Sequence, residues 1–355
     1  IKEGIILEWD GVESSVALSN IGGISFLVNG KADGHAINDA GTQIMAGLIA
    51  ALLHDNPKSS FVVGLGTGST AGWLAAVPSM ERVDVAEIEP VIKKVAEACE
   101  PVNHEAPKNP KISVIVGDGR EIIMSSARKY DIIASEPSNP YRAGISSLFT
   151  LDFYRSVASR LNPKGIFVHW VQAYEIDAGS IWTIYTTLTE VFPYVETWHT
   201  SGGDITLLAS MEPFQFDIQK LRSRIVSQPY SDALRYAWHV DSLEGFLARR
   251  MAGSELAQKI HSLPVKTVNT DDQNHLEFDF ARSVGTVRNF SAEQIYVEGR
   301  KFEDFHGVFA NSDVDLTEVE RRRLKMVPFA LRDKSRIKEE EGNIKARFDQ
   351  ALPVE

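Results

Sequence analysis

Short apolar runs alternate with longer segments of helical spacing through the middle of the chain. The apolar runs occupy residues 61–65, 83–88, 112–116, 131–134 and 166–170. Strands that alternate with helices in this way build βαβ units, and consecutive units form a parallel sheet with helices on both faces. The pattern therefore predicts an α/β fold with a doubly wound sheet.

The N-terminal segment has a different pattern. Apolar and polar positions alternate over residues 1–31, with turn signals of the Gly-Gly and Asn-Gly type between the short runs. Such alternation is typical of β-hairpins. We therefore expect a small β-rich subdomain over residues 1–38, followed by a helix over 39–54.

The second half of the chain changes pattern twice. Two strand-like runs, 194–198 and 205–209, are joined by a Ser-Gly-Gly-Asp turn and predict a hairpin at the edge of the sheet. Residues 212–262 have helical spacing throughout, and the end of the chain is charged and mostly helical. These changes divide the chain into a main domain over residues 39–282 and a charged helical extension over 283–355.

The composition is that of a folded enzyme or binding protein, with 43% hydrophobic and 24% charged residues. The net charge of −11 argues against nucleic acid as a partner. Affinity for nucleic acid comes largely from lysines and arginines that neutralise phosphates. A neutral or cationic small molecule fits this charge better.

Several signals are missing from the sequence. One cysteine, Cys99, allows neither an intrachain disulfide nor a cysteine-based zinc site, and it suits a cytoplasmic location. His35, His54 and His275 have no metal-ligand spacing, so we expect no metal. There is no run of about 18 apolar residues, so we expect no membrane contact by these residues. The chain begins at Ile1 rather than Met, which leaves open that a further segment precedes it.

The strongest chemical signal is a glycine-rich segment directly after the first apolar run. Glycines at alternate positions allow a tight turn from strand to helix, and they let backbone N–H groups approach a ligand at the helix N-terminus. A nucleotide site is therefore predicted at Gly64, Leu65, Gly66, Thr67 and Gly68. The segment also satisfies the dinucleotide fingerprint G-x-G-x-x-A, so the motif alone leaves the type of nucleotide open.

The next two strand ends carry acids. Glu87 and Ile88 end the second strand about 20 residues after the loop, where a carboxylate can accept both ribose hydroxyls. Asp118 and Gly119 follow the third strand, where the acid can accept from an adenine amino group. Taken singly, Glu87 could instead favour a helix N-terminus, and Asp118-Gly119 could form a turn. Three consecutive strand ends together favour an adenosine-binding crevice.

The fourth strand is followed by Glu136 in a proline-flanked loop. Open α/β sheets place their chemistry at this edge, where Glu136 could take a proton from an attacking amine or orient it. The alternative is a solvated loop carboxylate. After the fifth strand, His169, Trp170 and Gln172 are candidates for the pocket wall or for the core.

Together these segments resemble the spermidine synthases, or polyamine aminopropyltransferases, which share the Rossmann-like sheet of class I methyltransferases. The resemblance covers residues 1–282. It is closest to bacterial spermidine synthase-like proteins fused to membrane domains, which carry GLGTG, EPSNP and NTDD segments. It implies Glu87 on the ribose, Asp118 on the adenine and the glycine loop beside the sulfonium tail. The implied co-substrate is decarboxylated S-adenosylmethionine or S-adenosylmethionine, and the implied assembly is a homodimer.

The chain departs from this family's pattern at acidic positions. Thr67 stands where the glycine loop of the family carries an acid, and Glu136 and Asn139 occupy the two acidic positions after the fourth strand. Gln43 remains from a segment whose tyrosine and glutamate are missing. A buried ammonium without a paired acid is costly, so these departures call an ordinary diamine substrate into question. We expect Gln43, Asn139 and Asp271 to contact the substrate.

The primary hypothesis is alkyl transfer, in which an amine attacks the carbon next to the sulfonium and Glu136 acts as base. By resemblance, the enzyme would transfer an aminopropyl group to a small-molecule amine in polyamine biosynthesis. Methyl transfer is the second hypothesis, because neutral Thr67 would not repel a methionine carboxylate. The third is a catalytically silent nucleoside-binding or assembly module, and a dinucleotide site is the remaining alternative. The expected location is the cytoplasm, or the cytoplasmic part of a membrane-anchored protein.

Overall fold

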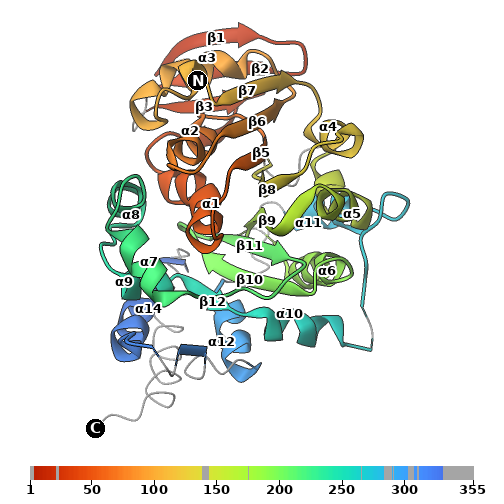
Figure 1. Cartoon of the computed structure of the whole chain (residues 1–355). Coiled ribbons are helices and arrows are strands. Elements are labelled where there is room, and N and C mark those ends of the chain that lie inside the picture. Colours follow the sequence, from red (N-terminus) through yellow and green to blue (C-terminus); the bar gives the residue numbers. More distant parts are fainter. Residues whose placement is uncertain are drawn as a thin grey trace.

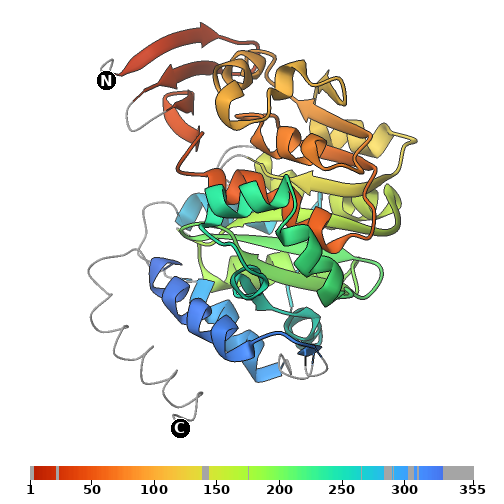
Figure 2. The ribbon, with the colours of Figure 1, turned by 60° about the vertical axis from the view of Figure 1, so that its left-hand side comes forward.

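The computed structural model contains two β-sheets and helices that pack around them (Figures 1 and 2). It describes residues 4–20, 24–137, 144–174, 176–264, 266–283, 290, 292–302, 308–309 and 312–330. The smaller sheet comes from the N-terminal segment and lies at the same end of the molecule as strands β6 and β7 (Figure 1). This placement makes it one wall of the cavity described below.

The N-terminal sheet is antiparallel, with its strands in sequence order. The strands are β1 (Ile5–Asp10), β2 (Ser15–Ser19), β3 (Ser25–Val28) and β4 (Lys31–His35). Val16, Leu18 and Phe26 from its inner face are buried in the same core cluster as helix α1 (Ala40–Leu53). The alternation of apolar and polar positions arises because only this face is buried. The predicted β-hairpins are confirmed.

The main sheet has eight strands in the order β12-β10-β11-β9-β8-β5-β6-β7. Its strands are β5 (Ser59–Val63), β6 (Arg82–Glu87), β7 (Ile112–Val116), β8 (Tyr130–Ser135), β9 (Leu161–Gln172), β10 (Tyr194–His199), β11 (Asp204–Ser210) and β12 (Arg250–Ala252). The strands from β5 to β9 run parallel, whereas β11 pairs antiparallel with both β9 and β10. Strand order reverses between β5 and β8, and ligands bind at such a switch point.

Helices cover both faces of the main sheet, so the sheet is doubly wound as predicted (Figure 1). One core cluster includes residues of α1, α2 (Ser69–Ala76) and α3 (Ile92–Ala98). The other includes residues of α4 (Gly119–Ser125), α5 (Leu151–Ser159) and α6 (Ala178–Thr189). Among the residues that the structure describes, no helix has both the length and the apolar character needed to cross a bilayer.

The later helices follow the edge hairpin. They are α7 (Ile218–Ile225), α8 (Tyr230–Trp238), α9 (Leu243–Leu247), α10 (Ser254–His261), α11 (His275–Ser283), α12 (Ala292–Phe302) and α14 (Leu316–Ala330). The shorter 3₁₀ turns are η1 (Glu100–Val102), η2 (Ala106–Lys108) and η3 (Ile145–Phe149). Helix α14 packs on α9 and α12, and its buried Arg323 pairs with Glu320. The charged C-terminal segment therefore includes a helix that is part of the folded body.

The prediction that residues 212–262 are helical throughout is wrong at β12. This strand pairs with β10 and extends the sheet beyond the predicted hairpin. Its Arg250 is buried and forms an ion pair with Glu196 of β10. A three-residue strand with a buried arginine has no apolar alternation to mark it in the sequence. Charge pairing between strands replaces the hydrophobic pattern there.

Candidate active site

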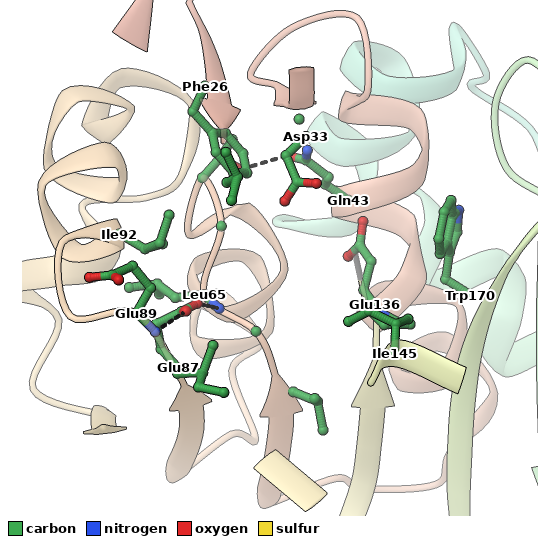
Figure 3. A pocket seen from close by; sticks show the side chains of 18 of the residues that line it. Phe26, Asp33, Gln43, Leu65, Glu87, Glu89, Ile92, Glu136, Ile145 and Trp170 are labelled. Carbon is green, nitrogen blue, oxygen red and sulfur yellow. Dashed lines mark hydrogen bonds between the residues drawn. The ribbon is translucent and has the colours of Figure 1, made fainter. Parts of the chain in front are cut away.

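A cavity of about 1000 Å³ lies at the carboxyl ends of β5, β6 and β8. The main sheet supplies one side, and Phe26 of β3 with residues 31–35 of β4 supplies the facing wall. Figure 3 shows Glu89 and Ile92 at one side of the cavity and Glu136 and Trp170 toward the other. Gly66, Glu87 and Asp118 all line this cavity, so the three predicted strand ends converge on one hollow.

The glycine loop joins β5 to α2 in backbone conformations that favour glycine. Gly64, Gly66 and Gly68 have φ values of +90°, +51° and +79°, in the left-handed region that other residues rarely adopt. Gly64 to Thr67 line the cavity, including Leu65. Gly68 is instead the residue before α2, and a Cβ there would come within 2.9 Å of the Asn103 side chain. Gly68 therefore shapes the loop from behind.

Glu87 fixes this loop to the end of β6. Its buried carboxylate accepts the backbone N–H of Leu65 at 2.8 Å and that of Glu89 at 2.9 Å. Burial raises the pKa of Glu87, and these N–H donors oppose the rise. Ile88 beside it is half-exposed and lines the cavity. The carboxylate is thus held in a fixed orientation at the position predicted for the ribose.

Asp118 and Gly119 lie at the start of α4 on the cavity wall. Asp118 Oδ1 accepts the backbone N–H of Arg120 at 2.7 Å and caps the helix. A Cβ on Gly119 would meet Val63 of β5 at 2.8 Å, so glycine allows the helix to start close to the sheet. Capping and cavity lining are compatible, because a carboxylate has a second oxygen free for a ligand.

Glu89 is a structural residue that the sequence analysis did not single out. Its carboxylate accepts backbone N–H groups from Glu13 at 2.8 Å, Ser14 at 3.1 Å and Val91 at 3.0 Å. The turn between β1 and β2 is thereby attached to the end of β6. This contact holds the N-terminal sheet over the cavity.

Glu136 lies at the end of β8 and lines the cavity. Thr70 Oγ1 donates to its carboxylate at 2.8 Å. Burial raises the pKa of Glu136 to about 8, and the nearby carboxylates of Asp204 and Asp39 add to the rise. A carboxyl with this pKa exchanges protons near neutral pH, as a general base must.

Asp204 and Asp39 are acids that the sequence analysis missed. Asp204 begins β11 and accepts from Thr42 Oγ1 at 2.8 Å, and burial raises its pKa to about 7. Asp39 precedes α1 and accepts the backbone N–H of His35 at 2.7 Å, and burial raises its pKa. Both residues line the cavity. Aspartate before a helix or in a hairpin turn is common, so neither position carried a functional signal.

Gln43 and Trp170 complete the acidic side of the cavity (Figure 3). Gln43 Oε1 accepts from the Thr67 hydroxyl, which connects α1 to the glycine loop. The Trp170 side chain lies beside Glu136. His169 is packed instead among Phe149, Tyr154 and Phe167 on the opposite face of the sheet, and burial lowers its pKa to about 3.

Two predicted substrate residues are not among the described residues that line the cavity. Asn139 lies outside the residues that the structure describes. Asp271 forms an ion pair with Arg120, and its backbone N–H donates to Asp152 at 3.1 Å. Arg120 also donates to the carbonyl oxygen of Ser147 at 3.3 Å, and Ser147 does line the cavity. Asp271 thus stands one contact behind the wall.

The described residues contain no group of three or more His, Cys, Asp or Glu side chains arranged to hold a metal ion. The acids of the cavity accept hydrogen bonds from backbone and hydroxyl donors, as described above. The chemistry that these residues can perform is therefore binding of positively charged groups and proton transfer.

The sheet order and the ligand-sized cavity at its switch point define a Rossmann-like α/β protein of the class I methyltransferase type, as predicted. Residues 41–201 match the family model described as the spermine/spermidine synthase domain. This part of the chain belongs to the spermine/spermidine synthase family.

Curated relatives agree with this assignment. The polyamine aminopropyltransferase of Thermoanaerobacter sp. is 27% identical over 52% of this chain and 69% of its own length. That of Nitrosomonas europaea is 27% identical over 53% of this chain and 60% of its own length. The thermospermine synthase of Arabidopsis thaliana is 28% identical over 50% of this chain and 55% of its own length.

Solved structures share the fold. The spermidine synthase of Thermotoga maritima superimposes with a TM-score of 0.55 at 19% identity, covering 63% of this chain and 78% of that one. A spermidine synthase in complex with the transition-state analogue AdoDATO gives a TM-score of 0.57 at 18% identity, covering 63% of this chain and 79% of that one. The predicted resemblance is confirmed, whereas fusion to a membrane domain remains a prediction.

The position of Asp271 generates a test of its predicted substrate contact. An Asp271→Asn change removes the ion pair to Arg120, and because exposed pairs are worth about 0–1 kcal/mol, we expect only a small loss of stability. We expect 5′-methylthioadenosine to bind about two- to fivefold more weakly by titration calorimetry, equivalent to less than about 1 kcal/mol. Asp272→Asn, at the exposed neighbouring position, is the control. A weakened amine affinity with unchanged nucleoside affinity would show instead that Asp271 contacts the amine.

The raised pKa values of Glu136 and Asp204 predict how stability depends on pH. Between about pH 4 and pH 8 the folded, ligand-free protein retains protons that the unfolded chain releases. The free energy of unfolding therefore falls as pH rises through this window, by at most about 1.4 kcal/mol per pH unit for each group. Urea unfolding at several pH values should show a shallower fall for Glu136→Gln. The exposed variant Glu298→Gln should keep the parent slope, and equal slopes for Glu136→Gln and the parent would refute the assignment.

Proposed function

We propose that the protein is an aminopropyltransferase that transfers the aminopropyl group of decarboxylated S-adenosylmethionine to a small-molecule amine. The observation that carries the proposal is the charge of the cavity. The acids that line it are Glu13, Asp33, Asp39, Glu87, Glu89, Asp118, Glu136 and Asp204. Lys31 is the lysine among the described lining residues, which include no arginine. A cavity of this sign attracts cations.

The same charge favours the decarboxylated donor. Decarboxylated S-adenosylmethionine carries a sulfonium and an ammonium, whereas S-adenosylmethionine also carries a carboxylate. Glu136 and Asp39 would repel that carboxylate on the acidic side of the cavity, and no lining arginine would neutralise it. Neutral Thr67 removes one acid from the loop, but the acids from other elements outweigh it. Methyl transfer is therefore the weaker alternative.

The donor would lie along the ends of three strands. Its ribose would meet the Glu87 carboxylate, its adenine would lie near Asp118 and Gly119, and its tail would pass the glycine loop toward Glu136. These placements are proposals supported by the common cavity and by the family match. Positioning of two reactants supplies much of the rate in such a reaction.

Transfer requires one bond to form and one to break. The lone pair of the acceptor nitrogen attacks the methylene carbon next to the sulfonium, the new N–C bond forms, and the C–S bond breaks. Its electron pair goes to sulfur, which departs as the neutral thioether 5′-methylthioadenosine. Glu136 accepts the proton that the nitrogen loses, and Thr70 holds the carboxylate in place.

The finer predictions about the setting of the enzyme follow from the family resemblance. We propose action in the cytoplasm, either as a separate protein or as the cytoplasmic part of a membrane-anchored one, and assembly as a homodimer. The single cysteine, Cys99, is buried and free, which agrees with a reducing compartment. A catalytically silent module is less well supported, because it gives no reason to bury Glu136 at the switch point.

Product analysis tests the proposal directly. Mass spectrometry after incubation with each sulfonium donor and a panel of amines should show aminopropylated products from the decarboxylated donor. Glu136→Gln should lower kcat by about 10²–10⁴-fold, the usual contribution of a general base. In the parent, kcat/KM should rise with pH up to about 8 as Glu136 ionises. Glu298→Gln serves as the control. Methylated products, or no product with any amine, would contradict the proposal.

A further inference from the structure

Asp204 reaches the cavity because its strand runs against its neighbour. Strand β11 is antiparallel to β9, and Asp204 at its beginning pairs with Gln172 at the end of β9. The start of β11 therefore lies at the same edge of the sheet as the carboxyl ends of the parallel strands. An acid at this position faces the ligand site although it belongs to the edge hairpin.

The Asp204 carboxylate is held from one side and open on the other. Thr42 of α1 donates to Oδ2 at 2.8 Å, and Thr200 lies 3.1 Å from the Thr42 hydroxyl. Oδ1 is buried and has no hydrogen-bond partner among the described residues. Leaving a buried polar atom unpaired costs about 1–3 kcal/mol. The structure thus maintains an acceptor whose donor does not come from the described protein.

The surroundings of Asp204 select a positively charged donor. Trp170, its diagonal neighbour on β9, also has a buried indole N–H without a partner within 3.5 Å in the described chain. The indole lies near enough to lower the pKa of Asp204. No described lysine or arginine pairs with Asp204, Asp39 or Glu136. A cation that enters would relieve the repulsion among these three carboxylates.

We infer that Asp204 determines acceptor specificity by binding the amino group of the acceptor that does not react. The inference deepens the proposed function and rests on it. Glu136 lies at the end of β8 nearer the glycine loop and serves the reacting nitrogen, while Asp204, supported by Thr42 and Asp39, holds the second ammonium. The preferred acceptor therefore carries at least two amino groups.

This assignment resolves the difficulty raised by the missing acids. The sequence argument against a diamine considered the positions now held by Thr67 and Asn139. The fold supplies Asp204 from β11 and Asp39 from the start of α1 at the same cavity. Carboxylates from other elements thus restore the charge that a second ammonium needs.

Paired acceptors test the inference. 1,4-Diaminobutane and n-butylamine have the same carbon chain and differ in the second amino group. Their affinities are measured by titration calorimetry on the full chain with 5′-methylthioadenosine bound, and their KM values by transfer assays. The variants are Asp204→Asn, which removes the charge with little change in shape, and Thr42→Val, which removes the hydroxyl that orients it. Asp241→Asn, an exposed aspartate outside the cavity, removes the same net charge as a control.

The parent should bind the diamine at least about tenfold more tightly than the monoamine, a difference of about 1.4 kcal/mol. Asp204→Asn should abolish most of this preference while n-butylamine and 5′-methylthioadenosine bind as before. Thr42→Val should have an intermediate effect, and Asp241→Asn should have none. Retained nucleoside binding shows that each variant is folded.

Two outcomes overturn the inference. One is an equal loss of affinity for both amines in Asp204→Asn, which would indicate a structural role. The other is a parent that does not distinguish the two amines. Failure of the proposed function is distinguishable, because absence of transfer by the parent would reject aminopropyl transfer, whereas Asp204-dependent diamine binding would still support the acceptor site.

Discussion

Burial of carboxylates without a cationic protein partner is the constraint on which this structure depends. Burial raises the pKa of Glu136 to about 8 and that of Asp204 to about 7, and the two groups stand with Asp39 at one cavity. Each unit of such a shift corresponds to about 1.4 kcal/mol between the protonation states. The ligand-free protein therefore holds protons at these acids that a cationic ligand can replace.

The fold creates this arrangement through strand direction and close packing. Parallel strands β5, β6 and β8 bring the glycine loop, Glu87 and Glu136 to one edge, and antiparallel β11 brings the start of its own strand to the same edge. Glu89 attaches the N-terminal sheet over the opening through three backbone N–H groups. The cavity is thus enclosed by parts of the chain that are far apart in sequence.

The sequence predicted those features that local pattern determines. Alternating apolar runs marked the parallel strands, and the φ requirements of Gly64 and Gly66 marked the loop. It did not predict β12, because Arg250 is stabilised by Glu196 rather than by apolar burial. It also missed Asp39 and Asp204, since a helix-preceding aspartate and a turn aspartate look the same whether or not a cavity lies beside them. Those contacts depend on long-range packing, as does the pairing of Asp271 with Arg120.

Proton release on binding tests the central claim most directly. The heat of binding 1,4-diaminobutane to the complex with 5′-methylthioadenosine can be measured at pH 7 in buffers of different ionisation enthalpy. The account predicts a net release of about one proton per diamine, because the entering ammonium groups favour ionisation of the buried carboxylates. Binding with no proton release, or with proton uptake, would contradict it.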